Sequence, residues 1–310
     1  MPDITGETDI ADRRQRAVTA AVAAGRDLGL TVTDPVVLHD VFSVLVHLAP
    51  SPVVVRVPVV LPSATDAQAQ DRMQTDELAV VAWLAERGVP VVPPSPLVPT
   101  EPVRRNGFGM TMWQLVHPID SPDDNPADIA DLHAAMRDYP GELPFLSAFD
   151  TMRSSLTELE GRPDLATPRD LDRAHGEWDV LEPWLRDRAG FESRFPGATT
   201  QPVHGDAPGY NVITTADRKL FADFECVTIG PVERDLSLVS ADGVAAYNEA
   251  ASRCGLRRLD PTVRTVMAAA GLLQAFATLS LVPQLPMLAE GLKPLLDQWR
   301  ASPSAGGLAD

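Results

Sequence analysis

The chain has 310 residues, of which 45% are apolar and 22% are charged, a composition typical of a soluble globular protein with enough apolar residues for two modest domains or lobes. Its 26 basic and 43 acidic residues give a formal net charge of -17. This excess of negative charge disfavours nucleic acid and anionic membrane surfaces as partners, because no basic patch in the sequence offsets the repulsion. The two cysteines, Cys226 and Cys254, fit neither a disulfide framework nor a zinc site, which suits a reducing compartment.

The first part of the chain is predicted to form one helix followed by antiparallel strands. It begins with the polar, acidic segment MPDITGETDIADRR, whereas a signal peptide would have a basic start and an apolar run. Residues 9–28 have the pattern of a charged helix, and Gly29 after them suits a helix C-cap. Short β-branched runs separated by polar residues or prolines then predict consecutive strands at 30–38, 41–49 and 53–61.

A second helix is predicted at 71–87, and the apolar run FGMTMWQLV predicts a further strand at 108–116. From about residue 128 apolar side chains return every three or four residues, which is typical of helices. These helices are expected at 128–139, 145–161 and 167–190. For the last of them Thr167 is the expected N-cap, and Pro168 follows at the first helical position.

The uncharged stretch 265–289 has the length of a membrane span, but polar residues and prolines interrupt it, namely Gln274, Thr278, Ser280, Pro283, Gln284 and Pro286. A buried core helix is therefore the better interpretation. The elements together predict a strand-rich amino-terminal lobe at 1–116 and a mostly helical carboxy-terminal lobe at 117–310, an α+β organisation. We expect a cytoplasmic protein with no membrane partner, and nothing in the sequence calls for an obligate protein partner.

Acidic and amide side chains are concentrated in the segment VHGDAPGYNVITTADRKLFADFE, residues 203–225, among strand-forming residues. If NVITT and KLFAD pair as a tight hairpin, Asn211 and Asp223 lie at its open end. A carboxylate and an amide oxygen there, together with phosphate oxygens, would form the hard-oxygen site that Mg²⁺ prefers. Asp206 precedes Asn211 by five residues and would lie beside the metal, where a base can orient an attacking hydroxyl. A polar surface turn is the alternative.

Two motifs in this part of the chain resemble those of the aminoglycoside phosphotransferase and choline kinase-like family. HGDAPGYN matches the loop H-G-D-x4-N, and FADFECVTIGPVERDLS matches a metal segment D-x-E that is followed by G and D-L. The resemblance implies a bilobal protein-kinase-like fold, with an antiparallel sheet and a helix in the first lobe, helices and an embedded β-hairpin in the second, and ATP in the cleft. It also implies that Asp206 is the catalytic base and that Asn211 and Asp223 bind Mg²⁺.

Three further residues of these motifs have expected supporting roles. By the resemblance His204 braces the loop, and from its residue type alone we favour a loop histidine that takes no part in the chemistry. Glu225 either touches the metal or supports its ligands, and we prefer the supporting role. Asp235 is expected to hold the loop in its conformation.

The first lobe offers a separate test, because a kinase needs a cation on a central strand and a helix carboxylate that fixes this cation. Arg56 is the single charge in the apolar run SPVVVRVPVV, and a buried charge requires a partner. On the following helix Glu77 shares a face with Val81 and Leu84, so it points towards the apolar side. We therefore expect an Arg56–Glu77 ion pair; an edge-strand arginine that reaches solvent is the alternative.

Two features depart from the family pattern. Lysine is usual where Arg56 stands, and the planar guanidinium is not a simple substitute at a phosphate site. No glycine occurs at 30–87, so the loop LHDVFS cannot be a glycine-rich phosphate loop, and Ser43 or backbone amides must bind the phosphates. Adenine is expected against the strand MTMWQLV, with hinge hydrogen bonds from the backbone between Trp113 and Leu115; plain core packing of this strand is the alternative.

The predicted function is ATP-dependent transfer of the γ-phosphate to a hydroxyl of a small molecule. Only eleven residues separate Asp223 from Asp235, which leaves no room for the activation segment of a protein kinase. Candidate acceptors are aminoglycosides, other hydroxylated antibiotics, amino sugars and amino alcohols. A basic acceptor would suit Glu177, Asp179 and Glu182 if they line the cleft, although solvated helix faces explain them equally well. The alternative function, favoured by the two departures, is a pseudokinase-like nucleotide-binding or partner-binding module without turnover.

Overall fold

The computed structural model describes residues 7–119 and 126–308 and divides into two compact units. The first unit comprises Met1–Asp120, Ile213–Phe221 and Leu281–Pro286, and the second comprises Ser121–Val212, Ala222–Ser280 and Met287–Asp310. The first contains an antiparallel sheet and the second is mostly helical, which confirms the predicted α+β organisation. The lobe boundary predicted at 116/117 falls within the first segment of the first unit.

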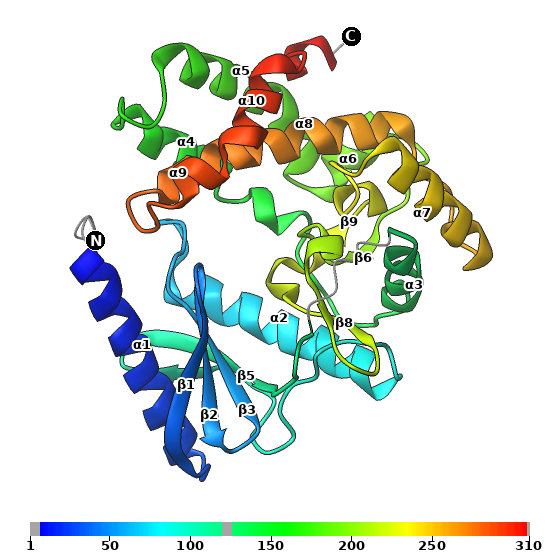
Figure 1. The fold of residues 1–310 in the computed structure, drawn as a ribbon. Coiled ribbons are helices and arrows are strands. Elements are labelled where there is room, and N and C mark those ends of the chain that lie inside the picture. Colours follow the sequence, from blue (N-terminus) through cyan, green and yellow to red (C-terminus); the bar gives the residue numbers. More distant parts are fainter. Residues whose placement is uncertain (1–6, 120–125, 309–310) are drawn as a thin grey trace. The chain divides into compact units, whose positions relative to one another are not determined.

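The first unit is built on a five-stranded antiparallel sheet with the order β1-β2-β3-β5-β4. In chain order its strands are β1 (Val32–Asp40), β2 (Ser43–Pro50), β3 (Val53–Pro58), β4 (Val103–Arg105) and β5 (Phe108–Gln114). The helices α1 (Glu7–Asp27) and α2 (Ala67–Glu86) pack against this sheet (Figure 1). All of these elements except β4 were predicted, and β4 has three residues, which is too short for an alternating pattern.

The core of the first unit lies between α1 and the sheet. On β2 the side chains of Val44, Val46 and Leu48 are buried and alternate with less buried neighbours, as expected for a strand with one face on a core. They meet a row of buried alanines on α1, namely Ala17, Ala20, Ala21 and Ala24. Because alanine side chains are small, the helix can approach the sheet closely.

The short hairpin of β7 (Val212–Thr214) and β8 (Lys219–Phe221) was predicted, but in the second lobe. The structure places most of it in the first unit, because β8 continues its hydrogen bonding onto another segment there. The Phe221 N–H donates to the Pro90 oxygen at 2.8 Å, and the Val92 N–H donates to the Phe221 oxygen at 2.9 Å. The two ends of the hairpin, with Asn211 and Asp223, belong to the second unit.

The second unit consists mainly of helices, with one short strand pair. The helices are α3 (Pro126–Met136), α4 (Met152–Glu160), α5 (Pro168–Leu185), α6 (Arg188–Arg194), α7 (Ala241–Arg253), α8 (Pro261–Ala277), α9 (Leu288–Gly291) and α10 (Lys293–Ala301). The antiparallel pair of β6 (Gln201–Val203) and β9 (Thr228–Gly230) was not predicted. The predicted N-cap of α5 is confirmed, because the Thr167 hydroxyl accepts a hydrogen bond from the Asp170 N–H at 3.1 Å. Helices α3 and α7 lie side by side (Figure 1).

Helix α8 and the 3₁₀ turn η5 (Thr278–Leu281) form the apolar stretch that was predicted as a core helix. By length and composition alone Pro261–Leu281 could cross a membrane. Much of it is buried inside the second unit, including Val263, Met267 and Leu273, against α4, α5 and α10. The helical stretch ends before Pro283, which accounts for a helix shorter than the predicted range.

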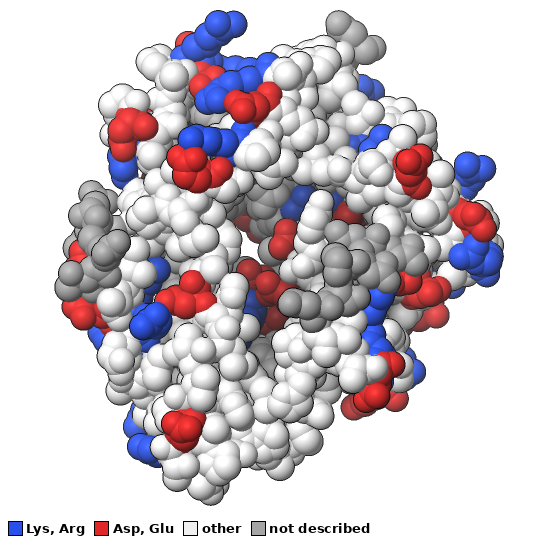
Figure 2. All heavy atoms as spheres, viewed as in Figure 1, with Lys and Arg blue, Asp and Glu red and all other residues white. Residues whose placement is uncertain are grey.

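The charged residues of the described chain are mixed in sign over the face shown in Figure 2. Lys and Arg side chains there lie among Asp and Glu side chains, and no continuous basic patch is visible on this face. Part of this mixing consists of surface ion pairs, such as Arg253 with Glu249 on α7 and Lys293 with Glu290. Such exposed pairs contribute little to stability.

Candidate active site

The loop between β6 and the 3₁₀ turn η2 (Pro208–Tyr210) carries Asp206 at the surface of the second unit. Gly205 has φ +86°, and a Cβ at this position would lie 2.0 Å from the Cys226 carbonyl oxygen, so only glycine fits. Ala207 has φ +39°, a left-handed conformation that is strained for a residue with a side chain. The residues on both sides of Asp206 therefore have unusual backbone conformations, which the surrounding structure must hold.

The buried carboxylate of Asp235 supplies this restraint. Its Oδ1 accepts the Gly205 N–H at 2.8 Å, and its Oδ2 accepts the His204 N–H at 2.9 Å. The side chain is fully buried. Burial alone would raise the pKa of Asp235, but hydrogen bonds from the His133 side chain and from the Gly205 N–H hold the pKa of this carboxyl below its ordinary value. The predicted role of Asp235 in holding the loop is thus confirmed.

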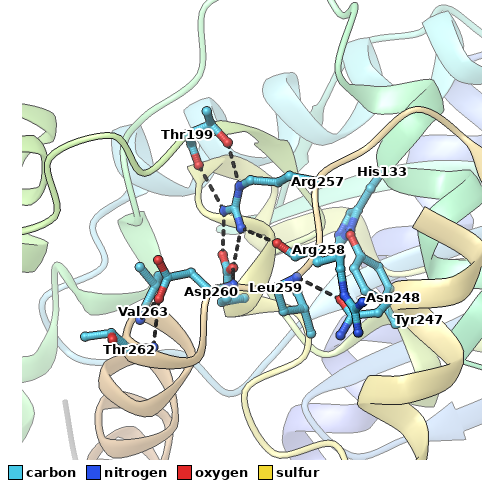
Figure 3. A network of polar contacts seen from close by, with 11 residues as sticks. His133, Thr199, Tyr247, Asn248, Arg257, Arg258, Leu259, Asp260, Thr262 and Val263 are labelled. Carbon is cyan, nitrogen blue, oxygen red and sulfur yellow. Dashed lines mark hydrogen bonds and ion pairs between the residues drawn. The ribbon is translucent and has the colours of Figure 1, made fainter. Parts of the chain in front are cut away.

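The segment that contains Asp235 is itself fixed by a second buried carboxylate. Glu233, in the 3₁₀ turn η4 (Val232–Arg234), accepts two hydrogen bonds from the Arg257 guanidinium, at 2.5 and 2.8 Å. It also accepts the Asp260 N–H at 2.6 Å. The same guanidinium donates to the Thr199 hydroxyl at 2.7 Å (Figure 3). Because a buried bidentate pair has a defined geometry, the turn that precedes Asp235 is held in place.

His204 connects the loop to the segment before Asp223. Its Nε2 lies 2.9 Å from the Ala222 carbonyl oxygen, and its ring packs against Phe224 with the centroids 4.6 Å apart. The side chain is fully buried, which keeps it away from a substrate at the loop surface. His204 therefore braces the loop, as the resemblance implied, and takes no direct part in chemistry there.

Asn211 and Asp223 lie next to each other across the open end of the hairpin, as predicted. The Asn211 side-chain N–H donates to the Asp206 carbonyl oxygen at 2.8 Å, and the Asn211 carbonyl oxygen accepts the Ala222 N–H at 2.8 Å. These two bonds join the loop of Asp206 to the residue that precedes Asp223. Asp223 is exposed and has φ +62°, a conformation that Asp tolerates better than most residues. The structure thus brings the three predicted residues into one loop cluster.

The donor set of this cluster fits a magnesium ion. Asn211 uses its amide N–H within the protein, so its Oδ1 is the atom that can face a cation, and Asp223 adds an exposed carboxylate. Glu225, half-buried in the following 3₁₀ turn, can support them. Within residues 7–119 and 126–308 no three His, Cys, Asp or Glu side chains are grouped to hold a metal. A site completed by phosphate oxygens does not need such a group, because Mg²⁺ takes few protein ligands.

In the first unit the predicted ion pair is present. Arg56 Nη2 contacts Glu77 Oε2, and both side chains are nearly inaccessible, at 8% and 1% exposure. Arg56 lies on β3 between Leu45 of β2 and Thr111 of β5, so it is on a central strand and the edge-strand alternative is wrong. The guanidinium is charged at all relevant pH values and Glu77 is its carboxylate partner on α2.

The remaining predicted nucleotide contacts are less clearly prepared. Ser43 is the first residue of β2 and is half-buried. Trp113 is buried, with its indole N–H donating to the Thr111 hydroxyl at 2.9 Å. The Leu115 N–H donates to the Pro52 oxygen at 3.0 Å, so this group is engaged within the unit and cannot act as the expected hinge donor. The Gln114 N–H is likewise engaged, since it donates to the Pro93 oxygen at 3.0 Å. Hinge hydrogen bonds from the remaining backbone groups of this segment stay a prediction.

The three acidic residues considered for a basic acceptor are all engaged within the second unit. Glu177 is buried and accepts the Trp299 indole N–H at 2.7 Å, which joins α5 to α10. Asp179 and Glu182 both pair with Arg153 of α4. None of the three is therefore a free carboxylate for a cationic acceptor, and they serve helix packing instead.

Two residues behind the loop were missed by the sequence reasoning. His133 of α3 is fully buried and its Nε2 lies 2.9 Å from Asp235 Oδ2, while its Nδ1 lies 2.8 Å from the Tyr247 hydroxyl of α7. The available signal was a histidine four residues after Ile129 on the apolar face of a helix, where a buried polar group needs partners.

Several solved structures are similar to this chain over most of its length. A choline/ethanolamine kinase family protein from Mesorhizobium loti is 15% identical, over 97% of this chain and 99% of its own, with a TM-score of 0.56. Choline kinase LicA from Streptococcus pneumoniae is 11% identical, over 90% and 98%, with a TM-score of 0.62. The aminoglycoside phosphotransferase APH(3'')-Id from Streptomyces rimosus, in complex with ADP and streptomycin, is 18% identical, over 86% and 97%, with a TM-score of 0.51. No curated protein matches the sequence.

These identities are low, so the likeness to solved structures establishes the bilobal protein-kinase-like fold alone. The sequence itself matches the model of the phosphotransferase enzyme family, APH, over residues 68–269. That range includes the loop of Asp206 and the segment of Asp223, which the structure joins by hydrogen bonds. The chain therefore belongs to the phosphotransferase enzyme family.

Proposed function

We propose that this phosphotransferase transfers the γ-phosphate of ATP to a hydroxyl of an aminoglycoside, an amino sugar or a similar hydroxylated metabolite. The observation that carries the proposal is the loop cluster of the second unit, in which hydrogen bonds join Asn211 to Asp206 and to Ala222, the residue before Asp223. Similar solved proteins support the substrate class, since one is a choline kinase and another was solved with ADP and streptomycin.

The roles of the residues follow from their chemistry. Asp206 is exposed and accepts the proton of the acceptor hydroxyl. At the same time the oxygen of that hydroxyl forms a bond to the γ-phosphorus. The bond between the γ-phosphorus and the β–γ bridging oxygen breaks, ADP leaves, and the proton passes from Asp206 to solvent. Asn211 and Asp223 would hold Mg²⁺, which when bound neutralises charge on the phosphate oxygens. Arg56, fixed by Glu77, is the cation proposed for the phosphates.

The negative net charge of the chain favours a cationic acceptor. The chain carries 43 acidic against 26 basic residues, so its field attracts cations and repels anions. Amine-bearing hydroxylated compounds are therefore favoured over neutral or acidic ones. Selectivity by Glu177, Asp179 or Glu182 is not part of the proposal, because other side chains of the second unit already engage them.

Asp206→Asn tests the proposal. The variant keeps the shape of the side chain but cannot accept the proton, so kcat should fall by about 10²–10⁴-fold. The variant should still bind ATP with Mg²⁺, which is measured by thermal shift. Asp217→Asn, at the exposed turn of the hairpin, is the matched control and should keep full kcat. Full activity of Asp206→Asn would remove the proposed base.

A second function is favoured by the arginine at position 56 and by the lack of glycine at 30–87. In this alternative the chain binds nucleotide or a partner without turnover. ADP release is measured with aminoglycosides, amino sugars and choline as acceptors, alongside the thermal shift. A nucleotide-dependent shift without stimulated ADP release for any acceptor would favour the non-catalytic module.

A further inference from the structure

A chain of buried hydrogen bonds runs from α7 to the loop of Asp206. The Tyr247 hydroxyl lies 2.8 Å from His133 Nδ1, and His133 Nε2 lies 2.9 Å from Asp235 Oδ2. Asp235 in turn accepts the N–H groups of His204 and Gly205, the two residues before Asp206. The rings of His133 and Tyr247 meet edge to face, with centroids 5.6 Å apart and planes at 73°; both residues are drawn in Figure 3.

The proton positions in this chain follow from its chemistry. The carboxylate of Asp235 accepts only, so His133 must carry a proton on Nε2. If the imidazole is neutral, Nδ1 accepts the Tyr247 O–H and every donor in the chain has an acceptor. If His133 were an imidazolium, Nδ1 would also donate, and the Tyr247 proton would need another acceptor, which the described part of the chain does not provide. The neutral Nε2–H tautomer therefore satisfies the network.

The environment of Tyr247 keeps its hydroxyl protonated and its ring in place. Burial, together with the nearby carboxylates of Glu233 and Asp235, raises the pKa of Tyr247 far above its ordinary value. The ring is fully buried in a core cluster with Ile129 and Ala250 among its members. Removing only the oxygen would thus leave the packing of the ring in place while the hydrogen bond to His133 is lost.

We propose that Tyr247 is a positioning residue for phosphoryl transfer, which fixes the orientation of the His133 ring and through it the Asp235 carboxylate that holds the loop of Asp206. The inference rests on the proposed function. It explains why a loop with left-handed Gly205 and Ala207 keeps one conformation, since the Asp235 carboxylate must stay aligned to accept both loop N–H groups. Loss of the Tyr247 hydroxyl leaves His133 held by Asp235 alone, so its ring can rotate and the loop loosens.

The direct test is Tyr247→Phe in the full chain. We expect kcat to fall by about 10–100-fold, the usual effect of removing a group that orients another functional group, with the KM values for ATP and acceptor nearly unchanged. Independently of activity, hydrogen exchange at the Gly205 and His204 amides, measured by NMR, should become faster. Because Asp235 still requires the proton on His133 Nε2, the ¹⁵N shift of Nδ1 alone should move, to that of an imidazole nitrogen that accepts no hydrogen bond.

Two comparisons separate positioning from general destabilisation. Ala250→Gly lies in the same helix and core cluster and lowers stability without touching His133, so it should lower Tm but leave kcat and Gly205 exchange unchanged. His133→Gln retains a donor that can reach Asp235 and should be more active than His133→Ala. In the His133→Gln background, Tyr247→Phe should have little further effect, because the two residues act through one chain.

The outcomes decide the inference separately from the proposed function. Unchanged kcat and unchanged Gly205 exchange in Tyr247→Phe would overturn the inference. A second result would also overturn it: Tyr247→Phe loses as much Tm as Ala250→Gly, loses no more kcat than that variant, and leaves Gly205 exchange unchanged. If Asp206→Asn proves fully active, the proposed function fails, while the exchange and ¹⁵N measurements still decide whether Tyr247 holds the loop.

Discussion

The loop cluster of the second unit and the sheet of the first unit are stabilised by different means. The loop of Asp206 is held by the hydrogen bonds that two of its backbone N–H groups donate to one buried carboxylate, and its sequence matches the family motif. The sheet presents one buried ion pair, Arg56 with Glu77, and lacks both the usual lysine and a glycine-rich turn. The proposed catalytic loop is therefore held by backbone geometry, whereas the sheet, which we propose binds the nucleotide, keeps a cation and a carboxylate but not the usual residue types.

The largest expected effect tests the loop side of this comparison. Asp223→Asn keeps a residue that tolerates the left-handed backbone but removes the negative charge that Mg²⁺ needs. We expect kcat to fall by about 10³-fold, equivalent to about 4 kcal/mol of transition-state stabilisation. A Mg²⁺ titration of ADP release measures it, with Asp217→Asn as control. A variant that reaches the wild-type kcat at saturating Mg²⁺ would exclude Asp223 as a required ligand.

The next effect concerns the sheet side and is one of stability. Glu77→Gln leaves the buried Arg56 charge without its carboxylate partner, and such a loss costs about 3–5 kcal/mol. The free energy of unfolding is measured by urea denaturation. Arg56→Lys keeps a cation opposite Glu77 and should lose much less, so it is the matched variant. Equal stability of Glu77→Gln and the wild type would show that the pair does not hold β3 and α2 together.

The sequence was informative where side-chain types determine structure locally. Valines that alternate along β2 and the helical repeat of α5 predicted those elements, and the cap at Thr167 followed from its neighbours. The loop of Asp206 could be found because its residues lie within a short segment. The Arg56–Glu77 pair was predictable because a charge in an apolar strand requires a partner on the next helix.

The parts that the sequence could not predict depend on contacts between distant residues. The β6–β9 strands have three residues each and carry no periodic signal. Glu177 was considered as a cleft residue, but burial under Trp299 of a distant helix determines its role. His133 and Tyr247 meet Asp235 from two different helices, and no motif brings these three together. The Leu115 N–H is engaged by Pro52, a carbonyl from an earlier turn.

The smallest expected effect, a dependence on pH, again contrasts the two regions. The pKa of Asp235 is lower in the folded protein than its unfolded value of about 3.9, so its ionised form stabilises the fold above that pH. This contribution is lost as the pH falls from about 4 through the folded pKa, by at most about 1.4 kcal/mol per pH unit. The free energy of unfolding of the wild type, measured in urea at pH 7, 5, 4 and 3, should therefore approach that of Asp235→Asn below about pH 4. Over the same range hydrogen exchange of the Gly205 amide should accelerate more than that of the Val55 amide in β3, since only the former donates to Asp235. Parallel pH curves for the two proteins, or equal acceleration at both amides, would show that Asp235 does not restrain the loop through its charge.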